Sequence, residues 1–181
     1  MTDLNRLAGL TATELTLLFA TPQTAPADMG HGDWLAVVQL LTARLTQEAK
    51  SLSATELNRG VEVLGGLLDQ AEQVGGINHD EVVIRRLHLT TALFDRRGSD
   101  PDVVLLDPRQ MYELFLGAVP FTLARVREFP ADWRTLDIGT VRRLRLMKNL
   151  LTPLLGAKSH LAEAGLGEEV SAWEEIMPRL P

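Results

Sequence analysis

The chain has 181 residues, 45% of them hydrophobic, and its 18 Lys and Arg against 24 Asp and Glu give a net charge of −6. A chain of this length can bury a core without disulfides or metals. The absence of cysteine excludes disulfides, thiol catalysis, iron–sulfur clusters and cysteine-rich zinc sites. No apolar run reaches the roughly 18 residues of a membrane span, and the N-terminus lacks the features of a secretory signal. We therefore expect a cytoplasmic protein.

Capping patterns mark the predicted helix starts. Thr11-Ala-Thr-Glu14 and Ser53-Ala-Thr-Glu56 both fit the capping box, in which hydroxyl and carboxylate each accept a free backbone N–H. The two segments are alike only over these few residues, so we interpret them as separate caps and not as a repeat. The predicted N-caps are Thr11, Asp33, Ser53, Asn78 and Asp107, the last followed by Pro108 at a favoured first position.

Apolar residues follow these caps at helical spacing. One stripe is Trp34, Val38, Leu41, Leu45 and Leu52, and the next is Leu57, Val61, Leu64, Leu68 and Ala71. Gly65 and Gly66 lie in the middle of the second helix, where each glycine costs about 1 kcal/mol relative to alanine. We therefore expect another helix, or a ligand, to approach closely there.

Glycine and proline mark the ends of the predicted elements. Residues 20–33 form an irregular Pro/Gly-rich connection, and Gly98 is predicted to end a helix in the left-handed conformation. Pro120 and Pro130 separate short helices. A longer helix is predicted from about Thr140, with a kink or break near residue 153, and a short acidic helix bearing Trp173 ends the chain.

These elements predict an all-α protein, an irregular multi-helix bundle of about eight helices with at most one short extended segment near 103–106. We expect a single domain over 1–181. Its sub-parts are an acidic helical half, 1–98, and C-terminal helices, 99–181, which include a basic segment at 121–160. We also expect a homodimer.

The basic segment 121–160 holds eight of the 18 Lys and Arg but three of the 24 Asp and Glu. Its net charge is therefore +5, whereas the rest of the chain carries −11. Such asymmetry indicates either an anionic partner or two parts of one fold that attract each other.

Residues 141–155 have two distinct faces when they are placed on a helix. The apolar arc covers about half of the circumference and consists of Leu144, Leu146, Met147, Leu150, Leu151, Leu154 and Leu155. The opposite stripe consists of Arg142, Arg145, Asn149 and Thr152, with Lys148 at its edge. Arg143 falls inside the apolar arc, so its guanidinium must extend to solvent or meet a carboxylate.

Two interpretations of these cations stay open. Nucleic-acid binding would use Arg125, Arg127, Arg142, Arg143, Arg145, Lys148 and Asn149. A helix-turn-helix needs a well-formed helix just upstream, however, and Pro130 limits any helix there. The stripe also lacks the interleaved aromatic residues of single-strand binders. We favour a solvated stripe that pairs internally or contacts a protein.

Aromatic residues gather just before the basic helix. Tyr112, Phe115, Phe121 and Phe129 lie within eighteen residues of a chain that is 5% aromatic. They could line a pocket for a small apolar ligand, form core, or face a partner helix. We interpret them as core plus interface.

Histidine and aspartate suggest one metal chemistry. The order His31, His79-Asp80, Asp95 resembles the HD phosphohydrolase superfamily, whose metal is held by such residues on helices. In that family the pair lies inside a helix, whereas here it follows Gly-Gly-Ile-Asn at a helix start, where an acidic first turn suits the dipole. His88 shares a face with Glu81 and Asp95, as in an acid–base pair, but it is better interpreted as exposed.

The sequence contains no phosphate-binding loop, nucleophile elbow or zinc-protease motif. We therefore predict no catalytic residue, metal or cofactor. The leading hypothesis is an accessory or regulatory protein that binds a protein partner or itself. The alternative is a nucleic-acid-binding protein, and the third is a metal-dependent hydrolase resembling the HD superfamily.

Overall fold

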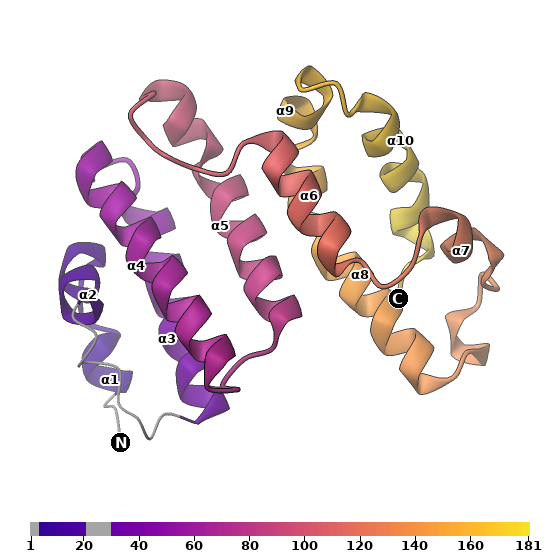
Figure 1. Ribbon diagram of the computed structural model, residues 1–181, viewed down its shortest axis with the longest axis horizontal. Coiled ribbons are helices and arrows are strands. Elements are labelled where there is room, and N and C mark those ends of the chain that lie inside the picture. Colours follow the sequence, from indigo (N-terminus) through magenta and orange to yellow (C-terminus); the bar gives the residue numbers. More distant parts are fainter. Residues whose placement is uncertain (1–3, 21–29) are drawn as a thin grey trace. The chain divides into compact units, whose positions relative to one another are not determined.

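The computed structural model describes residues 4–20 and 30–181, and over these ranges it is built of helices with no strand (Figure 1). This confirms the predicted all-α, multi-helix fold. The helices are α1 (Leu4–Leu7), α2 (Ala12–Phe19), α3 (His31–Glu48), α4 (Ala54–Gln73), α5 (His79–Ser99), α6 (Pro108–Ala118), α7 (Leu123–Glu128), η1 (Trp133–Thr135), α8 (Ile138–Gly156), α9 (Lys158–Glu163), α10 (Gly167–Ile176) and η2 (Met177–Arg179). Within the same ranges, no helix is both long and apolar enough to cross a bilayer.

The chain divides into two compact units. Unit 1 comprises Met1–Val82 and Ala92–Leu105, and unit 2 comprises Val83–Thr91 and Leu106–Pro181. Helix α5 therefore contributes its two ends to unit 1 and its middle turns to unit 2. The single domain expected from the sequence stays a prediction. The irregular connection expected at 20–33 falls mostly on 21–29, which lies outside the described residues.

Four predicted N-caps are confirmed. The Thr11 and Ser53 hydroxyls accept the backbone N–H groups of Glu14 and Glu56, and both carboxylates accept in return, so two complete capping boxes start α2 and α4. Asn78 caps α5. The Asp107 carboxylate accepts two N–H groups at the start of α6. Local side-chain chemistry thus starts these helices where the sequence predicts.

The N-cap of α3 was predicted wrongly. The helix begins at His31, with Gly30 as N-cap, and Asp33 is its third residue. The Asp33 carboxylate accepts the backbone N–H of Gly30 at 3.2 Å. Asp33 therefore stabilises this helix start from inside the first turn, where an acidic side chain also favours the dipole.

Unit 1 is built on α2, α3 and α4, which pack against one another. The predicted stripe of α3 is buried, with Val38, Leu41 and Leu45 at 0% exposure and Trp34 at 2%. Gly60 of α4 lies against α3, where an added Cβ would overlap the Leu45 side chain. The close approach of another helix at Gly65 and Gly66 is wrong within the described residues, since an added Cβ at either glycine would meet no described atom within 4 Å. The alternative expectation, a ligand at these glycines, stays a prediction.

The extended link before α6 is held by one side chain. Val103–Asp107 has no helical or strand assignment, as expected of a short extended segment. The Asn58 amide nitrogen donates to the Asp102 carbonyl at 2.8 Å, and its oxygen accepts the Val104 N–H at 2.8 Å. Asn58 thus pairs the backbone groups of the link, as a neighbouring strand would. Val103, which is 1% exposed, is buried and anchors the link.

The helix ends differ from expectation at two positions. Gly98 is not left-handed but lies inside the last turn of α5, which runs to Ser99. Pro153 does not break α8, which continues to Gly156. Helix α4 ends at Gln73, just before Gly75, which has φ +70° and so takes the conformation that favours glycine.

Unit 2 has its own apolar centre. Helix α10 packs on α7, α8 and α9, and α6 packs on α8 and α9. Met111, Met147 and Trp173 are among its largest fully buried side chains. Trp173 of the predicted C-terminal helix is therefore a core residue of this unit.

Two glycines provide a matched test of packing in unit 1. A Cβ at Gly76 would overlap the buried Trp34 indole, with Cγ at 2.9 Å, whereas a Cβ at Gly66 would meet no described atom within 4 Å. We expect Gly76→Ala to lower the free energy of unfolding by about 1–3 kcal/mol through overpacking. Gly66→Ala should raise it by about 0.5–1 kcal/mol through helix propensity. Urea denaturation followed by circular dichroism measures both, and equal effects would contradict the assigned packing.

Candidate functional site

The two faces of α8 are placed as predicted. Leu144, Met147, Leu150, Leu151 and Leu154 are buried, whereas Leu146 and Leu155 are half-buried. The side chains of Arg142, Arg145, Asn149 and Thr152 are exposed, and Lys148 at the edge is half-buried. Helix α8 is therefore anchored by its leucines and shows a narrow polar stripe.

Arg143 reaches solvent from the apolar side of α8. It is exposed, and its guanidinium lies 5.4 Å from the centre of the Phe121 ring. Its charge also helps to lower the pKa of Asp137, after the larger effect of hydrogen bonds from Thr140. The sequence predicts that the Arg143 guanidinium extends to solvent or meets a carboxylate. In the structure it is exposed to solvent and also lies against an aromatic ring.

Carboxylates neutralise several cations of the basic segment. Arg125 pairs with Glu128 of its own helix. Arg127 donates to both carboxylate oxygens of Glu175, at 3.3 and 2.9 Å, and Lys158 pairs with Glu174 at 2.8 Å. Since α10 supplies both Glu174 and Glu175, part of the charge asymmetry is compensated inside unit 2.

The C-terminal residues bind backbone carbonyls around α7 and α8. The Arg179 guanidinium donates to the carbonyls of Arg127 and Phe129, each at 3.2 Å. Lys148 donates to the carbonyl of Leu180 at 3.3 Å, and Leu180 is 5% exposed. These contacts hold α7 and its following loop and leave Lys148 less available to an outside partner.

The four predicted aromatic residues separate into two pairs. Phe115, 3% exposed, and Tyr112 pack on Trp173, with ring centres 5.4 and 5.8 Å away. Phe121 and Phe129 pack edge to face at 5.1 Å and are both half-buried. Phe115 belongs to the core, whereas Tyr112, Phe121 and Phe129 are half-buried.

Trp133 is a surface aromatic residue that our sequence analysis missed. It is half-buried, and the guanidinium groups of Arg134 and Arg145 lie 5.3 and 5.9 Å from its ring. The adjacency of Trp133 and Arg134 was visible in the sequence. The contact with Arg145 was not, because it depends on how the loop 129–137 folds back on α8.

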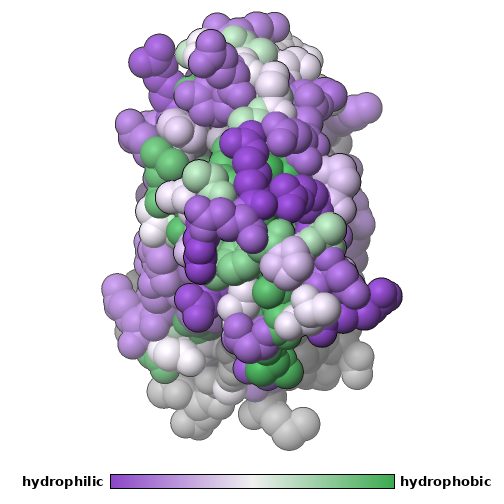
Figure 2. Space-filling model, turned by 90° about the vertical axis from the view of Figure 1, so that its right-hand side faces the viewer, coloured by the Kyte–Doolittle hydropathy of each residue, from purple (hydrophilic) through white to green (hydrophobic). Residues whose placement is uncertain are grey.

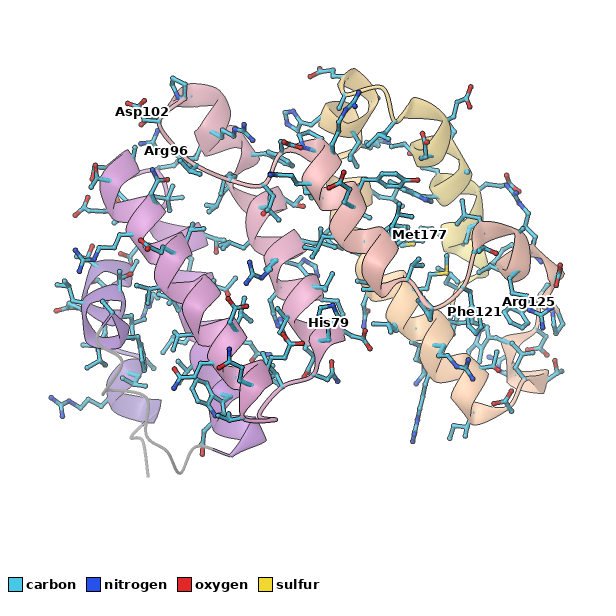
Figure 3. All side chains as sticks on the ribbon, in the orientation of Figure 1. His79, Arg96, Asp102, Phe121, Arg125 and Met177 are labelled. Atoms are coloured by element: carbon cyan, nitrogen blue, oxygen red, sulfur yellow. The ribbon has the colours of Figure 1, made fainter. Side chains whose placement is uncertain are left out.

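These contacts define an arginine–aromatic surface on unit 2. It consists of Phe121, Phe129 and Trp133 with Arg125, Arg134, Arg143 and Arg145. Figure 3 shows Phe121 and Arg125 near each other at α7. On the face in Figure 2, hydrophilic residues predominate and apolar residues form small separate areas among them. The cation–π contacts place guanidinium groups over the aromatic rings of this surface.

Not every cation of the basic segment has a carboxylate partner. Among the described residues, no carboxylate lies within ion-pair distance of Arg134, Arg142 or Arg145. Arg142 is exposed and contacts no aromatic ring in that part of the chain. One turn before it, Ile138 is 71% exposed. The guanidinium groups of these three arginines and the Ile138 side chain can therefore contact a partner.

The segment before α8 does not form a helix-turn-helix. The preceding α-helix, α7, ends at Glu128, and α8 begins at Ile138. Only the three-residue η1 lies between them. The motif requires a turn of about three or four residues, so the basic helix lacks the supporting helix expected of that motif.

Among the side chains that the structure describes, the histidines do not gather into a metal site. His79 pairs with Glu72 at 2.9 Å. Among described residues, no group of three His, Asp or Glu side chains could hold a metal. The side chains of His31 and Asp95 lie outside the described set. Desolvation, followed by the charge of Arg85, lowers the pKa of the exposed His88, which favours the neutral ring.

Unit 1 carries a groove whose lining includes Gly66, one of the two glycines where the sequence predicts a closely approaching helix or ligand. Its volume is about 770 Å³, and the end of α2 and one face of α4 line it. Phe19, Val63 and Leu67 are apolar lining residues, whereas Arg59 and Glu62 bring opposite charges. The mixed lining does not favour one ligand class.

Comparison with family models, with curated proteins and with solved structures found no match for this chain.

Trp133 can report the electrostatic potential of the arginine–aromatic surface. Trp34 and Trp173 are each 2% exposed, whereas Trp133 is half-buried beneath two guanidinium groups. We expect iodide to quench tryptophan fluorescence more strongly than caesium, because arginines concentrate anions. Trp133→Phe should remove most of this quenching, and Arg134→Ala with Arg145→Ala should reduce the preference for iodide. Stronger quenching by caesium would contradict the assigned environment.

Asp137 provides a test of how α8 begins. Its carboxylate caps the helix, accepting the Thr140 hydroxyl at 2.6 Å and backbone N–H at 2.9 Å, which lowers the pKa of Asp137. Because the pKa of Asp137 is lower in the folded state, its carboxylate stabilises the fold at pH values above the unfolded-state pKa. This stabilisation is lost as the pH falls through the folded-state pKa. We expect Thr140→Val to raise the pKa of Asp137 in a carbon-13 carboxyl titration. Thr140→Ser should keep it low.

Proposed function

We propose that this chain is a non-enzymatic accessory or regulatory protein that binds another protein through the arginine–aromatic surface. The observation that supports the proposal is that Arg134, Arg143 and Arg145 lie over half-buried Trp133 and Phe121. Arginine and aromatic residues are enriched in protein interfaces and dominate their binding energy. Rings that hold the guanidinium groups in place also reduce the entropy lost on binding.

Nucleic-acid binding is the second candidate, and the exposed Arg142 and Arg145 favour it. Three other cations proposed for phosphate contacts already have partners inside unit 2. Arg125 and Arg127 pair with carboxylates, and Lys148 donates to a backbone carbonyl. Neighbouring Glu128 and Glu175 would also repel a phosphate backbone. These observations favour a protein partner.

A metal-dependent hydrolase is supported less well, because His79 pairs with Glu72 at the start of α5. A second copy of the chain is one candidate partner, since the segment 121–160 carries +5 and the remainder −11. We therefore propose binding, including self-association, and not catalysis as the activity of the chain.

The test uses the wild-type chain and a variant, each immobilised as bait, to capture proteins from extracts of cells that express the chain. The wild-type chain should retain a protein that an Arg142→Ala, Arg145→Ala double variant does not retain, because both arginines are exposed. The retained protein is then purified and titrated against the wild-type chain by calorimetry. Defined stoichiometry and at least about tenfold weaker binding to the variant are expected if these arginines contribute as interface hot spots.

Two control experiments accompany this comparison. An Arg59→Ala bait removes an exposed cation from unit 1 and should retain the protein as the wild type does. Light scattering over a range of concentrations tests for a second copy as the partner. If nuclease treatment abolishes retention, the nucleic-acid function replaces the proposed one. If the wild type, the double variant and a Phe121→Ala, Trp133→Ala variant all retain the same proteins equally, the proposed surface is wrong.

A further inference from the structure

The exposed stripe of α8 continues the arginine–aromatic surface in one direction. Ile138, Arg142, Arg145, Asn149 and Thr152 are all exposed and follow each other at intervals of three or four residues. At 1.5 Å per residue, the stripe is about 21 Å long. It begins with an apolar side chain, has two cations in the middle and ends in neutral polar groups.

The arginines beside this stripe have hydrogen-bond donors available. The guanidinium groups of Arg134 and Arg145 lie 5.3 and 5.9 Å from the centre of the Trp133 ring, and neither side chain donates a hydrogen bond to another group within the part of the chain that the structure describes. No described carboxylate lies within ion-pair distance of either group or of Arg142. A planar guanidinium with free N–H groups is suited to bind a carboxylate through two parallel hydrogen bonds.

We propose that the stripe Ile138–Thr152 and Arg134 bind an acidic segment of a partner protein, whose carboxylates pair with Arg134, Arg142 and Arg145. This inference rests on the proposed function and names the chemistry of the partner. The segment needs about four helical turns, or a shorter extended stretch, to follow the stripe. It also needs an apolar residue to cover Ile138, which is 71% exposed.

Two observations favour carboxylates over nucleic acid at this place. The guanidinium groups of Arg134 and Arg145 already occupy positions over the Trp133 ring, so the ring is less available for base stacking. The capping carboxylates of Asp132 and Asp137 lie at η1 and at the start of α8. Their negative charges would repel a continuous row of phosphates, whereas single carboxylates of a partner can bind between them.

The test measures fluorescence anisotropy of a 20-residue peptide, (Leu-Glu-Glu-Ala)5, carrying an uncharged dye. Two other probes are measured for comparison. One is the same peptide with every Glu replaced by Gln, and the other is a dT20 oligonucleotide. The wild-type chain should bind the acidic peptide at least about tenfold more tightly than the Gln peptide or dT20. Arg142→Ala and Arg145→Ala should each weaken binding of the acidic peptide by about fivefold to tenfold, as expected of interface hot spots.

Two variants separate geometry from charge. Arg145→Lys keeps the charge but loses the flat guanidinium, so it should weaken binding nearly as much as Arg145→Ala. Arg59→Ala removes one exposed cation from α4 and should leave binding unchanged. An equal loss for Arg59→Ala, full retention by Arg145→Lys, or tighter binding of dT20 would each overturn the inference.

The inference and the proposed function can fail separately. A retained partner that depends on Phe121 and Trp133, but binds Arg142→Ala and Arg145→Ala normally, would leave the proposed function standing and overturn this inference. Self-association that competes with the acidic peptide and is lost in Arg142→Ala would identify the acidic segment as part of a second copy and support the inference.

Discussion

Along α8, Leu144, Met147, Leu150 and Leu154 are withdrawn from water, and their burial decides which way every other side chain of the helix faces. Each buried side chain of this size contributes about 1.5–3 kcal/mol. A rotation of the helix that exposed these residues would therefore be far more unfavourable than any gain from surface ion pairs. The exposure of Arg142 and Arg145 follows from this packing and does not require a partner.

The electrostatics of unit 2 follow from the same packing. Once α10 is anchored through Trp173 and Ile176, its Glu174 and Glu175 lie within reach of Lys158 and Arg127. These pairs are exposed and contribute little to stability, but they neutralise one side of the basic segment. Among the described residues, the cations without a carboxylate partner include Arg134 and Arg145 at Trp133 and the exposed Arg142. A small part of the segment, and not its total charge, is therefore available to a partner.

Local patterns predicted most of the fold. The caps at Thr11, Ser53, Asn78 and Asp107 act within three residues, and the stripe of α8 depends only on helical geometry. The errors arose where tertiary contacts decide, as at Gly65 and Gly66, where no described helix packs closely, whereas the Leu45 side chain packs against Gly60. The contact of Arg145 with Trp133 spans twelve positions and a folded loop, so no periodicity could have revealed it.

Asn58 has a chemical consequence for the ageing of the protein. Its amide is the donor to the Asp102 carbonyl and the acceptor for the Val104 N–H. Spontaneous deamidation would replace that donor nitrogen by a carboxylate oxygen facing another oxygen, turning attraction into repulsion. One slow hydrolysis at this amide would thus weaken the attachment of the link that leads from α5 to α6, while Val103 stays buried.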